Sequence, residues 1–203
     1  TSMAFFGTDA FNTIIHEMGH ALGLKHGHDA SFNGALAENV NDNEFSVMTY
    51  ASYLGSNTSQ VTEAINGSSP QSFMMYDIAA LQVLYGANYD KVNATAVYRW
   101  DASGQQFIND VAAPNTGVSA TNKIFTTVWT EGATATYDFS NFNEDASYDL
   151  RPGQWSTFSR SQLADLNRDA PAGTPQYMAQ GNVYNALLHG GDLRSAVSNV
   201  IGG

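Results

Sequence analysis

The chain has 203 residues, a length that fits one domain or two small ones, and its 43% hydrophobic and 13% charged residues are ordinary for a globular protein. A formal net charge of −11, with only 8 Lys and Arg residues, argues against nucleic acid as a partner, because phosphate binding requires basic clusters. The absence of cysteine excludes disulfides and thiolate metal ligands, and no hydrophobic run approaches the roughly 20 residues of a membrane span, so we expect no membrane insertion.

The first predicted element is a helix over residues 9 to 25, starting at Thr8 or Asp9, either of which can cap a helix N-terminus. Its apolar residues recur at steps of three and four, which is the periodicity of a helix. They are Phe11, Ile14, Ile15, Met18, Ala21 and Leu22.

This helix carries the motif H-E-M-G-H-A-L-G-L-K-H, which matches H-E-x-x-H-x-x-G-x-x-H. His16 and His20 are four residues apart and therefore lie on one helix face, with Glu17 one step round. Gly23 can adopt the positive φ that turns the chain back and brings His26 in as a third ligand. Three neutral imidazoles leave one coordination position for water, so the motif predicts a catalytic zinc site with Glu17 as general base.

The alternative is a pair of solvated histidines and a glutamate on an amphipathic helix. That explanation suits an isolated H-E-x-x-H, which arises by chance. The added Gly23 and His26 at fixed spacing favour the zinc site.

Residues 27 to 69 are rich in Asn, Ser and Gly and are predicted as loops. His28 is expected to be an exposed loop histidine beside Asp29, because His26 already satisfies the spacing of the motif. The segment S-V-M-T-Y, which contains Met48 and Tyr50, lies within these loops, and methionine alone usually fills gaps in a core.

A second helix is predicted from Ser69, as cap, and Pro70, in the first turn, to a stop at Gly86. Its stripe at three- and four-residue steps includes one carboxylate, Asp77. The stripe consists of Phe73, Met74, Asp77, Ile78, Leu81 and Leu84. Asp77 is either a charge near the helix start or a buried acceptor for backbone N–H groups of the turn around Met48.

From about residue 95 the pattern changes to short β-rich runs separated by turns, so we place a domain boundary near residue 90. His189, in this second part, is expected to be structural or solvent-facing. The fold class is therefore α+β, with a helical region over residues 1–90 and a β-rich region over 91–203.

The long zinc motif and the methionine that follows it resemble the metzincin superfamily of zinc endopeptidases, and S-V-M-T-Y resembles the methionine turn of its serralysin branch. The resemblance implies a secreted bacterial endopeptidase that hydrolyses protein or peptide substrates. It implies Tyr50 as an additional, switchable zinc ligand that donates a hydrogen bond to the oxyanion, and Met48 as an apolar floor beneath the histidines. It also favours Asp77 as the buried acceptor.

The likeness extends along the chain. Residues 70–86 resemble the last helix of the catalytic domain, 124–132 and 135–140 resemble the paired strands that open the second domain, and 195–203 resemble the segment before the calcium repeats of a β-roll. Metzincins have a twisted sheet ahead of the zinc helix, so we expect a fragment that lacks this sheet and the repeats. The missing N-terminal part would then be a partner that completes the cleft.

Calcium is a second candidate cation, but the family's calcium positions are altered here. Thr130 and Ala135 occupy positions of aspartate ligands, and Ser198 replaces a glutamate. The remaining weaker candidates are Asp101, Asp110 and Glu131. These changes leave open an alternative function, a non-catalytic calcium-dependent surface or adhesion module with a vestigial protease region, although the intact Glu17 argues against it.

Overall fold

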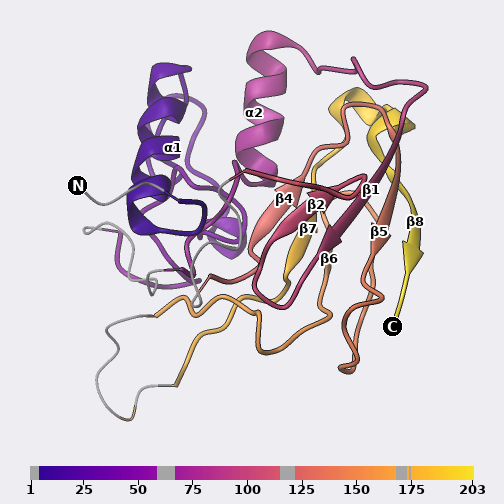
Figure 1. The fold of residues 1–203 in the computed structure, drawn as a ribbon. Helices are drawn as coiled ribbons and strands as arrows, with labels where there is room; N and C mark the ends of the chain where they lie inside the picture. Colours follow the sequence, from indigo (N-terminus) through magenta and orange to yellow (C-terminus); the bar gives the residue numbers. More distant parts are fainter. Residues whose placement is uncertain (1–4, 59–66, 115–121, 168–172, 174) are drawn as a thin grey trace.

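Helices and strands occupy different parts of the chain in the computed structural model, which describes residues 5–58, 67–114, 122–167, 173 and 175–203 (Figure 1). The helices are α1 (Asp9–Ala21) and α2 (Met75–Tyr85), with short 3-10 turns at Glu38–Val40, His189–Gly191 and Leu193–Ser195. The strands are β1 (Thr95–Trp100), β2 (Gln106–Ile108), β3 (Val111–Ala112), β4 (Thr126–Val128), β5 (Thr134–Asp138), β6 (Trp155–Ser156), β7 (Val183–Asn185) and β8 (Val197–Ile201). The protein is α+β, as predicted, and strands begin at the expected residue 95.

Helix α1 begins where predicted and ends earlier. The hydroxyl of Thr8 accepts a hydrogen bond from the Phe11 N–H at 3.2 Å, which caps the helix. The prediction that it continues to residue 25 is wrong, because Gly23 adopts φ 92° and the Leu24 N–H returns to the Gly19 carbonyl at 2.9 Å. This bond closes the helix with a Schellman-type turn.

Helix α2 ends at Gly86 as predicted, but its start at Ser69 and Pro70 is wrong. Residues before Met75 use their polar groups for tertiary hydrogen bonds instead. The Gln71 N–H donates to the Phe125 carbonyl at 2.9 Å, and the Ser72 hydroxyl accepts from the Thr127 N–H at 2.9 Å. Hydrogen bonds to a distant segment therefore override the local preference for a helix start at these residues.

The strands form two sheets, one in the order β3-β2-β1-β5-β8 and one in the order β4-β7-β6. The expected pairing of 124–132 with 135–140 is wrong, because β4 pairs in parallel with β7 while β5 pairs in parallel with β1 and β8. After the turn at Glu131 and Gly132, the Thr134 N–H donates to the Ala94 carbonyl at 2.9 Å. This bond places the start of β5 beside β1 directly after the turn.

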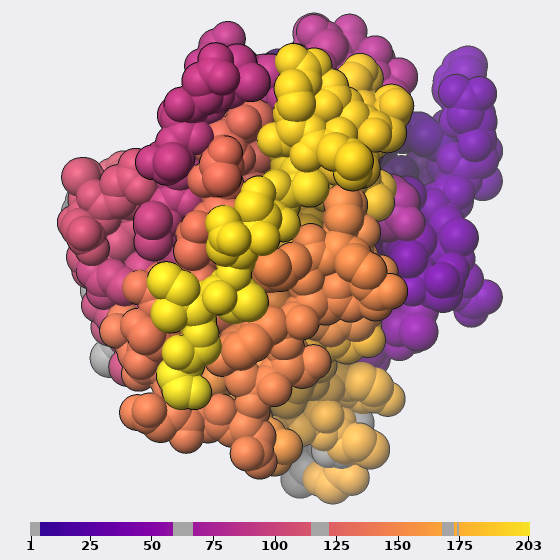
Figure 2. Space-filling view, turned by 90° about the vertical axis from the view of Figure 1, so that its right-hand side faces the viewer, coloured from indigo at the N-terminus to yellow at the C-terminus, as the bar shows by residue number. Residues whose placement is uncertain are grey.

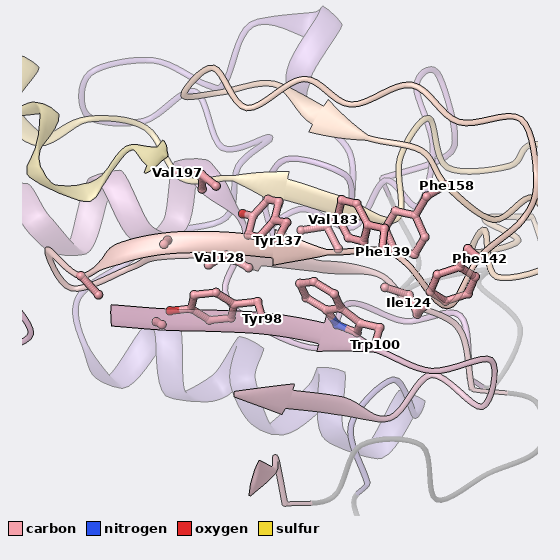
Figure 3. Close-up of a cluster of buried hydrophobic side chains, with 13 residues drawn as sticks. Tyr98, Trp100, Ile124, Val128, Tyr137, Phe139, Phe142, Phe158, Val183 and Val197 are labelled. Atoms are coloured by element: carbon pink, nitrogen blue, oxygen red, sulfur yellow. The ribbon is translucent and has the colours of Figure 1, made fainter. Parts of the chain in front are cut away.

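The three-stranded sheet lies between two hydrophobic clusters, which explains why every residue of β4 and β7 is buried. Val183 points into a cluster shared with the five-stranded sheet, where Tyr98, Trp100, Tyr137 and Phe139 gather (Figure 3). The next residue, Tyr184, points into a second cluster with Ile15, Met48 and Met75. The polar residues of these buried strands are hydrogen-bonded: the Thr126 hydroxyl donates to that of Ser72 at 3.1 Å, and the Asn185 side chain accepts from the Tyr137 hydroxyl at 2.9 Å.

The second cluster joins the two regions on either side of residue 90, since Phe45 and Met48 pack with Phe125, Leu166 and Tyr184. The C-terminal residues through β8 run over the surface of the β-rich region, on the side away from the N-terminal residues (Figure 2). In the part of the chain that the structure describes, no helix is long and apolar enough to cross a membrane.

Candidate metal centre

Three histidines meet at the C-terminal end of α1. A ring nitrogen of each of His16, His20 and His26 lies within 4.8 Å of the other two, and the Nε2 atoms of His20 and His26 are 3.0 Å apart. The turn at Gly23 makes this possible, because it reverses the chain and returns His26 to the helix face that carries the other two.

Backbone carbonyls fix the orientation of two of these rings. His16 Nδ1 lies 2.8 Å from the Val47 carbonyl oxygen, and His20 Nδ1 lies 2.9 Å from that of Leu24. A carbonyl can only accept a hydrogen bond, so each Nδ1 carries the hydrogen and each Nε2 keeps its lone pair. Converging imidazole lone pairs held by second partners are the donor set that zinc uses, so these residues fit that metal.

Met48 packs against α1 at Gly19. Its side chain is 2% exposed, and a β-carbon placed on Gly19 would be 2.3 Å from the Met48 sulfur. Gly19 stands between the two helical histidines in sequence, so its missing side chain leaves room for the methionine there. The Gly27 N–H donates to the Met48 carbonyl at 3.0 Å and ties the loop after His26 to the same turn.

Asp77 holds the Met48 turn from α2. Its side chain is 3% exposed and accepts hydrogen bonds from the Ser46 hydroxyl at 2.6 Å, the Val47 N–H at 2.8 Å and the Met74 N–H at 2.9 Å. Burial raises the pKa of Asp77 to about 6, while these donors act in the opposite direction. These contacts match the second of the two alternatives predicted from sequence, a buried acceptor for the turn around Met48. The same carboxylate also accepts from the N–H of Met74, the residue before α2.

Tyr50 and Glu17 are the two residues to which the sequence assigns catalytic roles. The Tyr50 ring centroid is 4.5 Å from that of His26 and 5.7 Å from that of His16. Glu17 follows His16 on α1 and is exposed to solvent. The structure therefore brings the Tyr50 ring to the histidine cluster and leaves Glu17, the residue after His16, exposed to solvent.

A cleft of about 630 Å³ adjoins His26 on the side facing α2. Leu24 and Leu36 line it from the loop, and Ala80, Val83 and Leu84 line it from the helix. The metal centre therefore borders a largely apolar recess on that side.

The prediction of an exposed His28 is wrong. Its ring stacks on that of His26, with centroids 5.1 Å apart and planes 10° apart, and lies 4.9 Å from Tyr50. The residue is half-buried, and this burial lowers the pKa of His28. The sequence contained one signal, since His28 is two residues beyond His26 in a chain already turned toward the metal centre. His189, by contrast, lies in the β-rich region, in a 3-10 turn.

The carboxylates considered for calcium do not come together. Asp101 accepts hydrogen bonds from Ser103 and Gln105 within its own turn. Asp110 pairs with Arg99 at 3.5 Å, and Glu131 pairs with Lys91 at 2.8 Å. Within the described ranges, the only cluster of three or more potential His, Cys, Asp or Glu ligands is the histidine trio.

Sequence reasoning also missed a buried acidic pair next to the Met48 turn. Asp42 and Glu44 are both buried, and Glu44 accepts hydrogen bonds from the Tyr184 hydroxyl and, at 2.7 Å, from the Gln180 N–H. Burial, aided by the neighbouring Glu44, raises the pKa of Asp42 to about 7. The pair connects the loop of the metal centre to the β-rich region through polar contacts.

An α+β scaffold that converges three histidines over a buried methionine defines a metal-binding protein of the H-E-x-x-H type. No protein-family model matches the chain. It is 29% identical to a serralysin of Proteus mirabilis over 186 residues, which are 89% of this chain and 35% of that relative. It is 33% identical to serralysin C of Dickeya chrysanthemi and 31% identical to metalloprotease AprA of Pseudomonas entomophila, in each case over 71% of this chain.

The chain is therefore serralysin-like, which confirms the resemblance seen in its motifs. It covers 29% of serralysin C and 30% of AprA, so it spans about a third of the length of the curated relatives that it matches.

Proposed function

We propose that the protein is a zinc-dependent endopeptidase that hydrolyses peptide bonds of protein substrates outside the cell. The observation that carries the proposal is the convergence of His16, His20 and His26, with carbonyls fixing the hydrogens of the first two away from the common point. Relatives named serralysin and metalloprotease support the same activity and do not favour an adhesion module.

His16, His20 and His26 would hold the zinc, with Tyr50 as an additional ligand. When bound there, zinc supplies a Lewis acid that polarises a carbonyl and makes water more acidic. The buried Met48 gives the histidines an apolar support of fixed shape, and Asp77 keeps that support in place through the hydrogen bonds that it accepts from Ser46 and Val47.

Glu17 is the proposed general base. Its exposed carboxylate beside His16 takes the proton of the attacking water and passes it to the leaving amine. The hydroxyl of Tyr50 donates a hydrogen bond to the oxyanion of the tetrahedral intermediate, a contribution worth roughly 3 kcal/mol where such donors are removed. Each role follows from a position next to the histidine cluster.

We also propose the finer architecture that the resemblance implies. Residues 1–90 would form the C-terminal part of a metzincin catalytic domain, comprising α1, the Met48 turn and α2. Residues 91–203 would form a β-rich domain leading into a β-roll. The substrate cleft would then require the N-terminal part of the same protein.

The test is Glu17→Gln, which keeps the size of the side chain and removes its basicity. We expect peptidase activity on a casein-type substrate to fall by about 10²- to 10⁴-fold, with one zinc still bound per chain. Glu38→Gln, an exposed substitution outside the cluster, is the matched control and should leave turnover unchanged. Undiminished turnover in Glu17→Gln would rule out the general-base assignment.

A further inference from the structure

A fourth histidine belongs to the metal centre without being placed to bind the metal. His28 forms a triangle of rings with His26 and Tyr50, whose centroid separations are 5.1, 4.9 and 4.5 Å. The cluster of potential ligand nitrogens nevertheless comprises only the other three histidines. His28 therefore touches one proposed ligand on each side and lies outside the group of converging nitrogens.

One ring nitrogen of His28 also lacks a hydrogen bond. Its Nδ1 atom is buried and has no hydrogen-bond partner among the residues that the structure describes. Leaving a buried polar atom unpaired costs about 1–3 kcal/mol, so such an atom in a native fold calls for an explanation. The Tyr50 hydroxyl can supply the missing hydrogen bond, because the Tyr50 ring already lies next to that of His28, with centroids 4.9 Å apart.

The backbone around His28 holds the ring in place. The Gly27 N–H bonds to the Met48 carbonyl at 3.0 Å, and the Asp29 N–H bonds to the His26 carbonyl at 3.1 Å. The Lys25 ammonium donates to the carbonyls of Asp29 and Ser31, each at 2.5 Å. A side chain between anchors on both sides is restricted in where it can move, which suits a positioning role.

We propose that His28 is a positioning residue for Tyr50. Its ring packs against Tyr50 and His26 and confines the phenol to the metal centre, and its unpaired nitrogen accepts the hydrogen bond of the Tyr50 hydroxyl when that group turns away from the three histidines. This inference rests on the proposed function only for its kinetic consequence, because the contact between the two side chains is independent of turnover.

The experiment compares His28→Phe, which keeps a flat ring and loses both nitrogens, with His28→Asn, whose amide places a polar group near the position of Nδ1. His189→Phe is the matched control, a histidine in the β-rich region. For each protein, zinc affinity is measured by chelator competition, and kcat and KM are measured on a peptide. The phenolate-to-copper charge-transfer band is recorded after loading with Cu²⁺ at one fixed pH. Tyr50→Phe identifies the band.

We expect His28→Phe to bind zinc within about threefold of the wild type, to lose roughly 10- to 100-fold in kcat with KM little changed, and to show an altered band. His28→Asn should recover a large part of both signals, and His189→Phe should match the wild type. A purely structural role would lower zinc affinity and folded fraction without this rescue.

An unchanged band and kcat in His28→Phe would overturn the proposal, and a loss of bound zinc in His28→Phe and His28→Asn alike would make His28 a ligand instead. If the wild type shows no peptidase activity while the band still responds to His28, the proposed function fails and the positioning role stands.

Discussion

The metal-centre region and the β-rich region of this molecule are stabilised in different ways. In the β-rich region, buried rings stack directly on one another, with Phe139 and Phe158 centroids 4.0 Å apart and Trp100 5.8 Å from Phe139. In the metal-centre region, hydrogen bonds to backbone carbonyls orient His16 and His20, and hydrogen bonds to the buried carboxylate of Asp77 hold the turn that precedes Met48. Helix α1 leaves Ile14 48% and Met18 47% exposed.

The two regions are therefore expected to affect different properties, namely the free energy of unfolding and the positions of the metal ligands. Apolar packing supplies free energy in proportion to buried area and is non-directional, whereas hydrogen bonds to a buried carboxylate are directional and define the positions of their donors. We therefore expect substitutions in the aromatic cluster to lower the free energy of unfolding, and substitutions around the Met48 turn to change metal affinity as well.

The largest loss of stability should come from Trp100→Ala, since Trp100 is fully buried at the centre of the aromatic cluster. We expect the free energy of unfolding to fall by about 3–5 kcal/mol, measured by urea denaturation, while the zinc affinity of the folded protein stays the same. Val111→Ala, on an exposed strand, is the control. A drop in zinc affinity in the folded mutant would show that the two regions are coupled.

Asp77→Asn should lower the free energy of unfolding by less than Trp100→Ala, and it should also lower zinc affinity. The amide presents N–H donors where the carboxylate accepts from Ser46, Val47 and Met74, so we expect a loss of about 2–3 kcal/mol. Zinc affinity should fall about 10- to 100-fold, because the Val47 carbonyl that orients His16 loses its support. The exposed Asp90→Asn is the control; equal zinc affinity in both variants would contradict the prediction.

The buried Asp42 predicts a pH dependence of stability. Its pKa rises from 3.8 to about 7 on folding, so between these values the native state binds a proton that the unfolded state releases. The free energy of unfolding should therefore decrease as pH rises from about 4 to 7, by up to about 1.4 kcal/mol per pH unit. Asp42→Asn should reduce this slope in denaturation series at several pH values and leave the part below about pH 6 to which the raised pKa of Asp77 contributes, whereas Asp90→Asn should preserve the whole slope.

The smallest effect is expected on the exposed side of α1. Met18→Gln should change the free energy of unfolding by less than about 0.5 kcal/mol, because nearly half of the side chain already contacts solvent. Ile15→Ala, on the buried side of the same helix, should cost several times more. Thermal unfolding of the two variants side by side measures the contrast.

Much of the local structure was predictable from residues close in sequence. Thr8 as the cap of α1, Gly86 as the end of α2 and the onset of strands at Thr95 depend on short-range backbone preferences, and the structure agrees with them. The start of α2 and the pairing of β4 were not predictable in this way. They depend on hydrogen bonds between Ser72 and Thr127 and between β4 and β7, which are far apart in the chain.

The spacing in H-E-x-x-H-x-x-G-x-x-H by itself determined that two imidazoles share a helix face and that a turn can return a third, because helix periodicity and the positive φ of Gly23 are local properties. Only the tertiary structure decided what surrounds those three residues. Packing between α1, the Met48 turn and the loop after Gly27 brought His28 and Tyr50 into ring contact and buried Asp77 and Asp42. Burial and contacts of this kind depend on segments that meet only after the chain has folded.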